Sequence, residues 1–115
     1  MTVTIYHNPR CSKSRETLAM LEERGYTPDV VRYMDTLLEP SIIEELLQKL
    51  GFNSARELMR TKEAIYKELA LETTDDESTL LKAMSEHPKL IERPIVVNGQ
   101  KAALGRPPEQ VLAIL

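Results

Sequence analysis

The amino-acid sequence predicts an α/β fold in which helices flank a mixed central sheet and a block of helices is inserted. Three observations lead to this prediction. Residues 2–33 have the pattern of a strand, a helix and a strand. Residues 39–87 have helical periodicity. Residues 95–115 have the pattern of two strands joined by a tight turn and followed by a helix.

The first elements are a strand, a helix and a second strand. Thr2–Tyr6 alternates β-branched and aromatic residues and predicts a short strand. After a turn, Cys11 or Ser12 begins a helix that Gly25 ends. Asp29–Tyr33 predicts the second strand. The connection is long enough for two parallel strands joined by a right-handed crossover.

The middle of the chain is predicted to be helical throughout. The first of these helices has a proline at its start and Gly51 just past its end. The expected helices are Pro40–Leu50, a short helix through Arg60 that Asn53 or Ser54 caps, Lys62–Ala70 and Asp75–His87. Pro88 stops the last of them.

The C-terminal elements complete the predicted sheet. Ile95–Val97 is a short apolar strand, Asn98-Gly99 is a hairpin turn signal, and Lys101–Leu104 is the returning strand. Pro107–Leu115 begins with prolines and continues as a helix.

Without the helical middle, the order β-α-β and β-β-α is the thioredoxin arrangement. We therefore expect a single domain over residues 1–115, because 115 residues match the length of one domain. A thioredoxin-like core takes about residues 1–38 and 89–115, and a helical insertion takes about 39–88. An α+β domain of another topology remains the alternative.

Composition excludes several classes of protein. Eighteen acidic residues against fifteen Lys and Arg give a net charge of -3, which offers no general attraction to nucleic acid. The longest apolar run is the five residues Val111–Leu115, too short to cross a membrane, and no signal-peptide pattern is present. One cysteine excludes an intrachain disulfide and a multi-cysteine metal site, so we expect a cytoplasmic protein without a metal.

The single cysteine, Cys11, follows a strand and a His-Asn-Pro turn and stands at the start of a helix. Exposed N–H groups and the helix dipole stabilise a thiolate at that position, and His7, Arg10 and Arg15 are near it in the sequence. The alternative for Cys11 is a buried, inert side chain, as most free cysteines are. Its position favours a reactive thiol.

Ser14 lies one helical turn after Cys11, where a dithiol oxidoreductase has its second cysteine. A serine hydroxyl cannot form a disulfide, but it can donate a hydrogen bond to a thiolate. If the protein is a redox enzyme, the second thiol must therefore come from another molecule.

Four motifs together resemble one family. They are His7-Asn8-Pro9-x-Cys11-x-x-Ser14-Arg15-x-Thr17-Leu18, Arg56-Glu-Leu-Met-Arg60, Ile91-Glu-Arg93-Pro94-Ile-Val-Val97 and Leu104-Gly-Arg106-Pro107. Their order and spacing over nearly the whole chain resemble the glutaredoxin-coupled arsenate reductases, the ArsC family of the thioredoxin-like superfamily. The short chain is most similar to the YfgD-like subgroup.

The resemblance implies a reaction and its residues. Cys11 would attack the arsenic of arsenate, and Arg60, Arg93 and Arg106 would hold the oxyanion. Glutathione would then attack the adduct as a co-substrate, and glutaredoxin would remove the glutathione from Cys11 and leave arsenite. No bound cofactor is implied, and we expect a monomer.

The resemblance also implies supporting roles. His7 and Ser14 would favour the thiolate, Arg15 would support it, and Pro94 would follow a cis peptide bond that faces Cys11.

Other assignments stay open at this point. Arg56 competes with Arg60 for one oxyanion role, and Arg60 at a helix end also suits the helix dipole. The protein could instead be an Spx-like regulator that binds a large protein partner without catalysis. It could also be a glutathione-linked thiol oxidoreductase that acts on another substrate.

Overall fold

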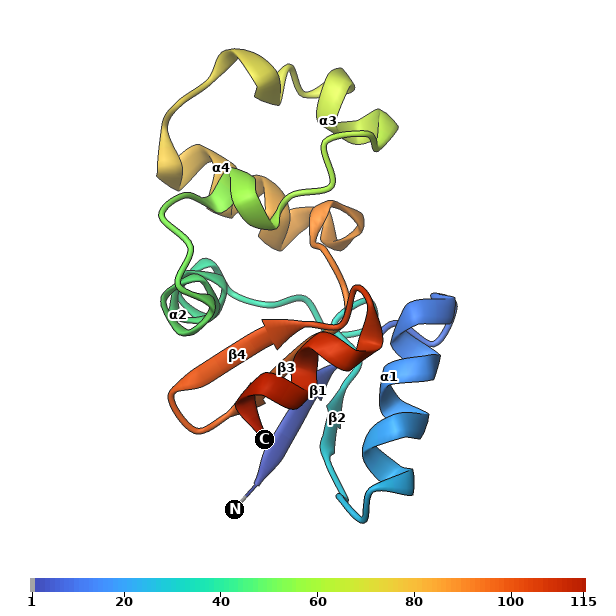
Figure 1. The fold of residues 1–115 in the computed structure, drawn as a ribbon. Helices are drawn as coiled ribbons and strands as arrows, with labels where there is room; N and C mark the ends of the chain where they lie inside the picture. Colours follow the sequence, from blue (N-terminus) through green and yellow to red (C-terminus); the bar gives the residue numbers. More distant parts are fainter. Residues whose placement is uncertain (1) are drawn as a thin grey trace. The chain divides into compact units, whose positions relative to one another are not determined.

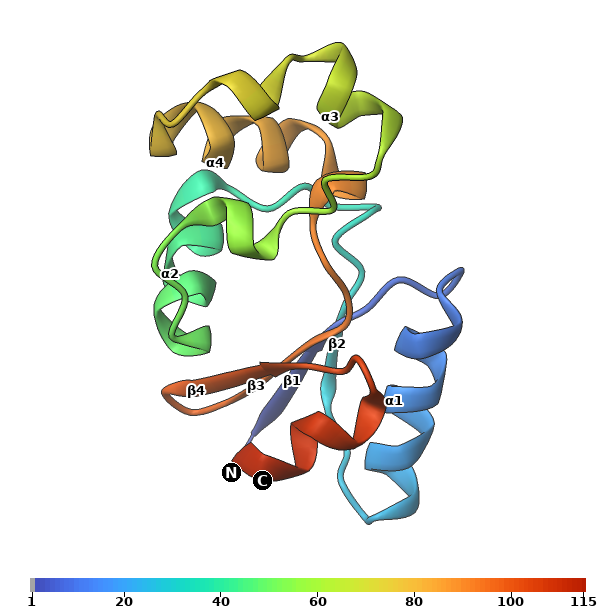
Figure 2. The ribbon, with the colours of Figure 1, turned by 45° about the horizontal axis from the view of Figure 1, so that its top comes forward.

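The computed structural model describes residues 2–115, which form two compact units. The first unit contains the residues up to Asp35 together with Arg93–Leu115, and the second contains Thr36–Glu92. Figure 1 and Figure 2 show the elements of both units from two directions. The first unit therefore combines the two ends of the sequence, and the second is continuous.

Within residues 2–115, the first unit is built on a mixed sheet with the strand order β2-β1-β3-β4. β1 (Val3–Tyr6) pairs in parallel with β2 (Asp29–Val31), and α1 (Ser12–Glu23) is the crossover between them. β3 (Ile95–Asn98) is antiparallel to both β1 and β4 (Lys101–Leu104). The predicted thioredoxin-like α/β fold is confirmed.

The core of the first unit lies where α1 and the C-terminal 3₁₀ helix η4 (Pro108–Ile114) pack against the strands. Ile5 and Val96 are fully buried and face each other across the β1–β3 ladder. Burying a side chain of this size stabilises the fold by about 1.5–3 kcal/mol. The cluster consists of Val3, Ile5, Leu21, Val96 and Val111.

The second unit is helical, as predicted. It contains α2 (Pro40–Leu50), α3 (Ala64–Glu68) and α4 (Glu77–Glu86), and α2 packs against α4. The 3₁₀ helices η1 (Ala55–Leu58) and η2 (Leu71–Thr73) lie between them, and η3 (Pro88–Leu90) follows α4.

Two predicted helices differ from expectation. The helix expected through Arg60 is the 3₁₀ helix η1, which Ser54 and Glu57 cap reciprocally. It ends at Leu58 because Met59 forms a β-bridge with Ile91, which takes the backbone out of a helical path. The expected C-terminal helix is also a 3₁₀ helix.

None of the helices in residues 2–115 combines the length and the apolar character that crossing a membrane requires.

Candidate active site

Cys11 is the N-cap residue of α1 and follows directly on the turn after β1. Its N–H donates to the carbonyl of Asn8 at 3.0 Å, and its carbonyl accepts from the N–H of Arg15 at 3.0 Å. The Asn8 side chain closes the turn, because its Oδ1 accepts from the N–H of Arg10 at 3.0 Å. The half-buried thiol therefore stands at the end of the helix where N–H groups point outward.

The pKa of the Cys11 thiol lies below its ordinary value. Burial raises this pKa, but hydrogen bonding from the Ser14 N–H, the Arg93 side chain and the Lys13 N–H outweighs it, together with the charge of Arg93. The predicted lowering is confirmed in direction. The N–H groups of the first turn of α1 contribute as predicted, whereas the side chain that lowers the pKa is Arg93 and not His7 or Arg15.

Arg106, like Arg93, lies beside Cys11 in the first unit. Its Nη1 is 3.9 Å from the Cys11 Sγ and donates to the carbonyl of Arg93 at 3.2 Å. Within residues 2–115, the buried Nε of Arg93 has no hydrogen-bond partner. The thiol is thus accompanied by two guanidinium groups, and one of them has a donor available for an anion.

Both arginines precede prolines. The Arg93–Pro94 peptide bond is cis, which confirms that prediction, and the Arg106–Pro107 bond is cis as well, which the sequence reasoning missed. The carbonyl of Pro94 accepts from the N–H of Gly105 at 3.0 Å and so joins the two segments.

Gly105 is required by a close approach. A Cβ built on Gly105 would lie 2.5 Å from Thr17 Oγ1 and 2.7 Å from Pro94 Cγ, so no larger residue fits without movement. In the sequence, the glycine itself is the one sign of this close approach. The contact packs α1, Pro94 and the end of β4 together beside the two arginines.

His7 and Ser14 are buried and bonded to each other. His7 Nδ1 and Ser14 Oγ are 2.6 Å apart, and Ser14 Oγ also accepts from the N–H of Asn8 at 3.0 Å. Burial lowers the pKa of His7, and the charges of Arg32 and Arg15 lower it further. His7 is therefore a neutral residue that anchors the turn to α1, and Ser14 acts on the thiol through its backbone N–H.

Arg15 contacts the backbone of the same turn. Its Nη1 donates to the carbonyl of Pro9 at 2.9 Å. This bond ties the first turn of α1 to the residues that precede Cys11, so Arg15 stabilises the shape of the turn.

Arg60 and Arg56 both belong to the second unit. Arg60 donates to Glu92 at 3.0 Å and to Glu63 at 3.4 Å, so two carboxylates accompany its charge. Arg56 donates to the hydroxyl of Tyr66 at 2.8 Å and to backbone carbonyls of the following loop. Arg56 thus holds the loop around Leu71 and Thr74, and the oxyanion role expected for Arg60 stays a prediction.

Among the described residues, no cluster of three or more His, Cys, Asp or Glu side chains could hold a metal ion. The polar groups that converge on Cys11 are hydrogen-bond donors and cations, which suits an anionic ligand.

Comparison with known proteins identifies relatives over the full length. The family model described as ArsC family matches residues 6–114. The chain is 58% identical to the Escherichia coli protein YfgD over 98% of this chain and 96% of that protein. It is 52% identical to a protein of Haemophilus influenzae named arsenate reductase, over 100% of both chains.

Solved structures match equally well. The structure named arsenate reductase from Vibrio cholerae has a TM-score of 0.97 and 55% sequence identity, and the match covers 100% of this chain and 98% of that one.

Proposed function

Because the chain belongs to the ArsC family, we propose that it is an arsenate reductase in which Cys11 is the nucleophile. The observation that carries the proposal is a half-buried thiol of lowered pKa beside Arg93 and Arg106. Cationic donors next to an anionic nucleophile suit attack on an oxyanion, because they offset the repulsion between two negative species.

In the first step, the Cys11 Sγ attacks arsenic, an S–As bond forms and one As–O bond breaks. The departing oxygen takes up protons and leaves as water. Arg93 and Arg106 bind the remaining oxygens, and the unpartnered Nε of Arg93 is one available donor. Each charge-assisted hydrogen bond contributes about 1.5–3 kcal/mol.

In the second step, glutathione supplies the other sulfur. The chain has one cysteine, so no internal disulfide can form. The glutathione thiolate attacks Cys11, an S–S bond forms, and the electrons of the S–As bond remain on arsenic, which is reduced from +5 to +3 and leaves as arsenite. A glutaredoxin thiolate then attacks the glutathione sulfur and releases the Cys11 thiolate.

The remaining residues support this chemistry. His7, Ser14 and Arg15 hold the turn that presents Cys11, and Pro94 fixes the segment that carries Arg93. We further propose that the enzyme is a monomer and acts in the cytoplasm, where glutathione keeps Cys11 reduced.

The proposal is tested by arsenate-dependent oxidation of NADPH in the presence of glutathione, glutaredoxin and glutathione reductase. We expect turnover by the wild type and none by Cys11→Ser. Arg93→Ala or Arg106→Ala should lower kcat/KM for arsenate about 10- to 100-fold, from about 1.5–3 kcal/mol lost per contact. Unchanged arsenate turnover in both arginine variants would contradict the oxyanion site.

The electron donor is tested separately by withholding glutaredoxin. Mass spectrometry should then show a glutathione mixed disulfide on Cys11 that requires arsenate and is absent from Cys11→Ser. Thioredoxin alone should be a poor substitute for glutathione and glutaredoxin. Full turnover with thioredoxin and no glutathione would overturn the mechanism, and a regulatory protein would form no arsenate-dependent adduct.

A further inference from the structure

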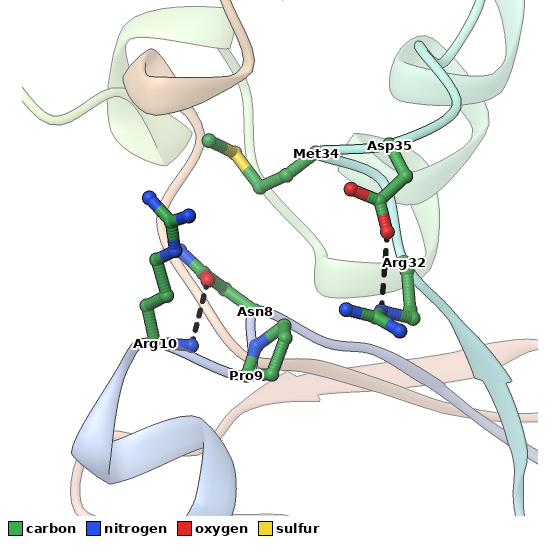
Figure 3. Close-up of a pocket in the computed structure, with 6 residues that line it drawn as sticks. All are labelled: Asn8, Pro9, Arg10, Arg32, Met34 and Asp35. Carbon is green, nitrogen blue, oxygen red and sulfur yellow. Dashed lines mark hydrogen bonds and ion pairs between the residues drawn. The ribbon is translucent and has the colours of Figure 1, made fainter.

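A pocket of about 280 Å³ lies in the first unit, next to the turn that leads to Cys11. We call it the Arg10–Arg32 pocket, and its lining residues are Asn8, Pro9, Arg10, Arg32, Met34 and Asp35. Figure 3 shows Arg10 on one side and the Arg32–Asp35 pair on the other. Ligand pockets in proteins have volumes from about 300 Å³ upward. This pocket is at the lower end of that range, so its size suits part of a small peptide.

The walls of this pocket carry a particular charge pattern. Arg32 Nε and Asp35 Oδ2 are 3.2 Å apart, so one wall presents a positive and a negative group side by side. Both side chains are exposed, and an exposed pair adds little to stability, so its members are free to exchange partners with a ligand. With Arg10 opposite, the pocket has one net positive charge.

We propose that the Arg10–Arg32 pocket binds the γ-glutamyl amino-acid group of glutathione. This group carries an ammonium and a carboxylate on one carbon, which matches Asp35 beside Arg32. Glutathione as a whole has one net negative charge, which the net positive charge of the pocket attracts. The inference rests on the proposed function, in which glutathione is the second thiol.

The position of the pocket fits this ligand. Asn8, Pro9 and Arg10 line it and directly precede Cys11, so a peptide anchored there lies beside the turn that presents the reactive thiol. Met34 supplies an apolar surface for the methylene groups of the γ-glutamyl chain. The pocket also interacts electrostatically with His7, because the charge of Arg32 lowers the pKa of His7.

Steady-state kinetics test the proposal with glutathione and the two dipeptides γ-Glu-Cys and Cys-Gly as thiol donors. Arg10→Gln and Arg32→Gln should each raise the KM for glutathione about tenfold, with the KM for arsenate within about twofold of wild type. Wild type should prefer γ-Glu-Cys over Cys-Gly, and Arg32→Gln should lose that preference. Arg24→Gln is the matched control, because Arg24 is an exposed arginine about 18 Å along α1 and should leave every KM unchanged.

Binding is measured independently of turnover with S-methylglutathione, whose blocked sulfur cannot react. NMR should show shifts of the Asn8 and Arg10 amides and an upward shift of the His7 pKa, because a bound carboxylate offsets the charge of Arg32. If wild type turns over with glutathione but Arg10→Gln and Arg32→Gln keep its KM, the pocket assignment is wrong and the proposed function stands. If S-methylglutathione binds here without arsenate turnover, the pocket assignment stands and the proposed function fails. If neither is observed, both are wrong.

Discussion

Replacing Arg93 with alanine should make Cys11 a slower nucleophile at neutral pH. Burial raises the pKa of the thiol, and the groups that overcome burial are the N–H of Ser14, the Arg93 side chain and the N–H of Lys13. Arg93 is the one side chain among them, and it acts both as a donor and as a charge. Its removal leaves the two backbone N–H groups of α1 to stabilise the thiolate alone.

The size of the effect follows from one charge-assisted hydrogen bond. Such a bond contributes about 1.5–3 kcal/mol. Cys11 is half-buried, so water partly replaces the lost donor and the lower end of the range applies. About 1.5 kcal/mol corresponds to a roughly tenfold smaller thiolate fraction below the pKa. The pKa of Cys11 should therefore rise toward that of an ordinary thiol.

The rate of alkylation by iodoacetamide, measured as a function of pH, reports this fraction directly. At pH values below the pKa of both thiols, the Arg93→Ala variant should react about five- to tenfold more slowly than wild type, and this deficit should disappear at high pH, where both thiols are ionised. Arg32→Ala is the matched control, since it removes the same charge from an exposed side chain of the first unit, which pairs with Asp35. It should alkylate within about twofold of wild type, while the pKa of His7 rises because a charge that lowers it is gone.

Two results would refute this reasoning. One is an alkylation profile of Arg93→Ala that superimposes on that of wild type. The other is a loss in Arg32→Ala as large as that in Arg93→Ala, which would mean that general positive charge, and not a contact, activates the thiol.

Three further predictions concern stability. Gly105→Ala should lower the free energy of unfolding by about 1–3 kcal/mol, measured in urea, because its Cβ would collide with Thr17 and Pro94; an unchanged midpoint would exclude the close packing. The wild type should lose stability as the pH falls below about 6.5, because the pKa of His7 is lower in the folded than in the unfolded state and unfolding takes up a proton. His7→Gln should make the loss of stability with falling pH less steep. An equally steep loss in the variant would mean that other groups cause it. Arg56→Ala should lower the free energy of unfolding by about 1–3 kcal/mol, because backbone carbonyl groups lose their hydrogen bonds. An unchanged Tm would contradict this prediction.

Much of the fold could be predicted because local signals agree with the final packing. Pro40 and Gly51 delimit α2 at the predicted residues, and the turn Asn98-Gly99 connects strands at the predicted places. The helix predicted through Arg60 fails because a bridge between Met59 and Ile91, more than thirty residues apart, overrides local helical preference.

Less of the candidate site could be predicted, because its interactions depend on where distant segments meet. Nothing near Ser14 indicates that its hydroxyl would bond His7 and the Asn8 N–H, or that its backbone would serve the thiol. The sequence likewise does not indicate that Asp35 and Arg32 line a pocket, because the other lining residues come from the distant segment 8–10.

The pairing of β1 with β3 has a consequence for folding during synthesis. Residues 3–6 pair with residues 95–98, so closing this ladder joins points about 90 residues apart, at an entropic cost of about 4 kcal/mol plus a constant. The helical unit between them is contiguous and meets no such requirement. Before residues 93–106 have emerged from the ribosome, Cys11 has neither Arg93 nor Arg106 beside it, and its thiol lacks the stabilisation that these cations give to the thiolate. We therefore expect Cys11 to become reactive only after almost the whole sequence has emerged, and slow alkylation of Cys11 in ribosome-bound chains truncated before residue 93 would reveal this delay.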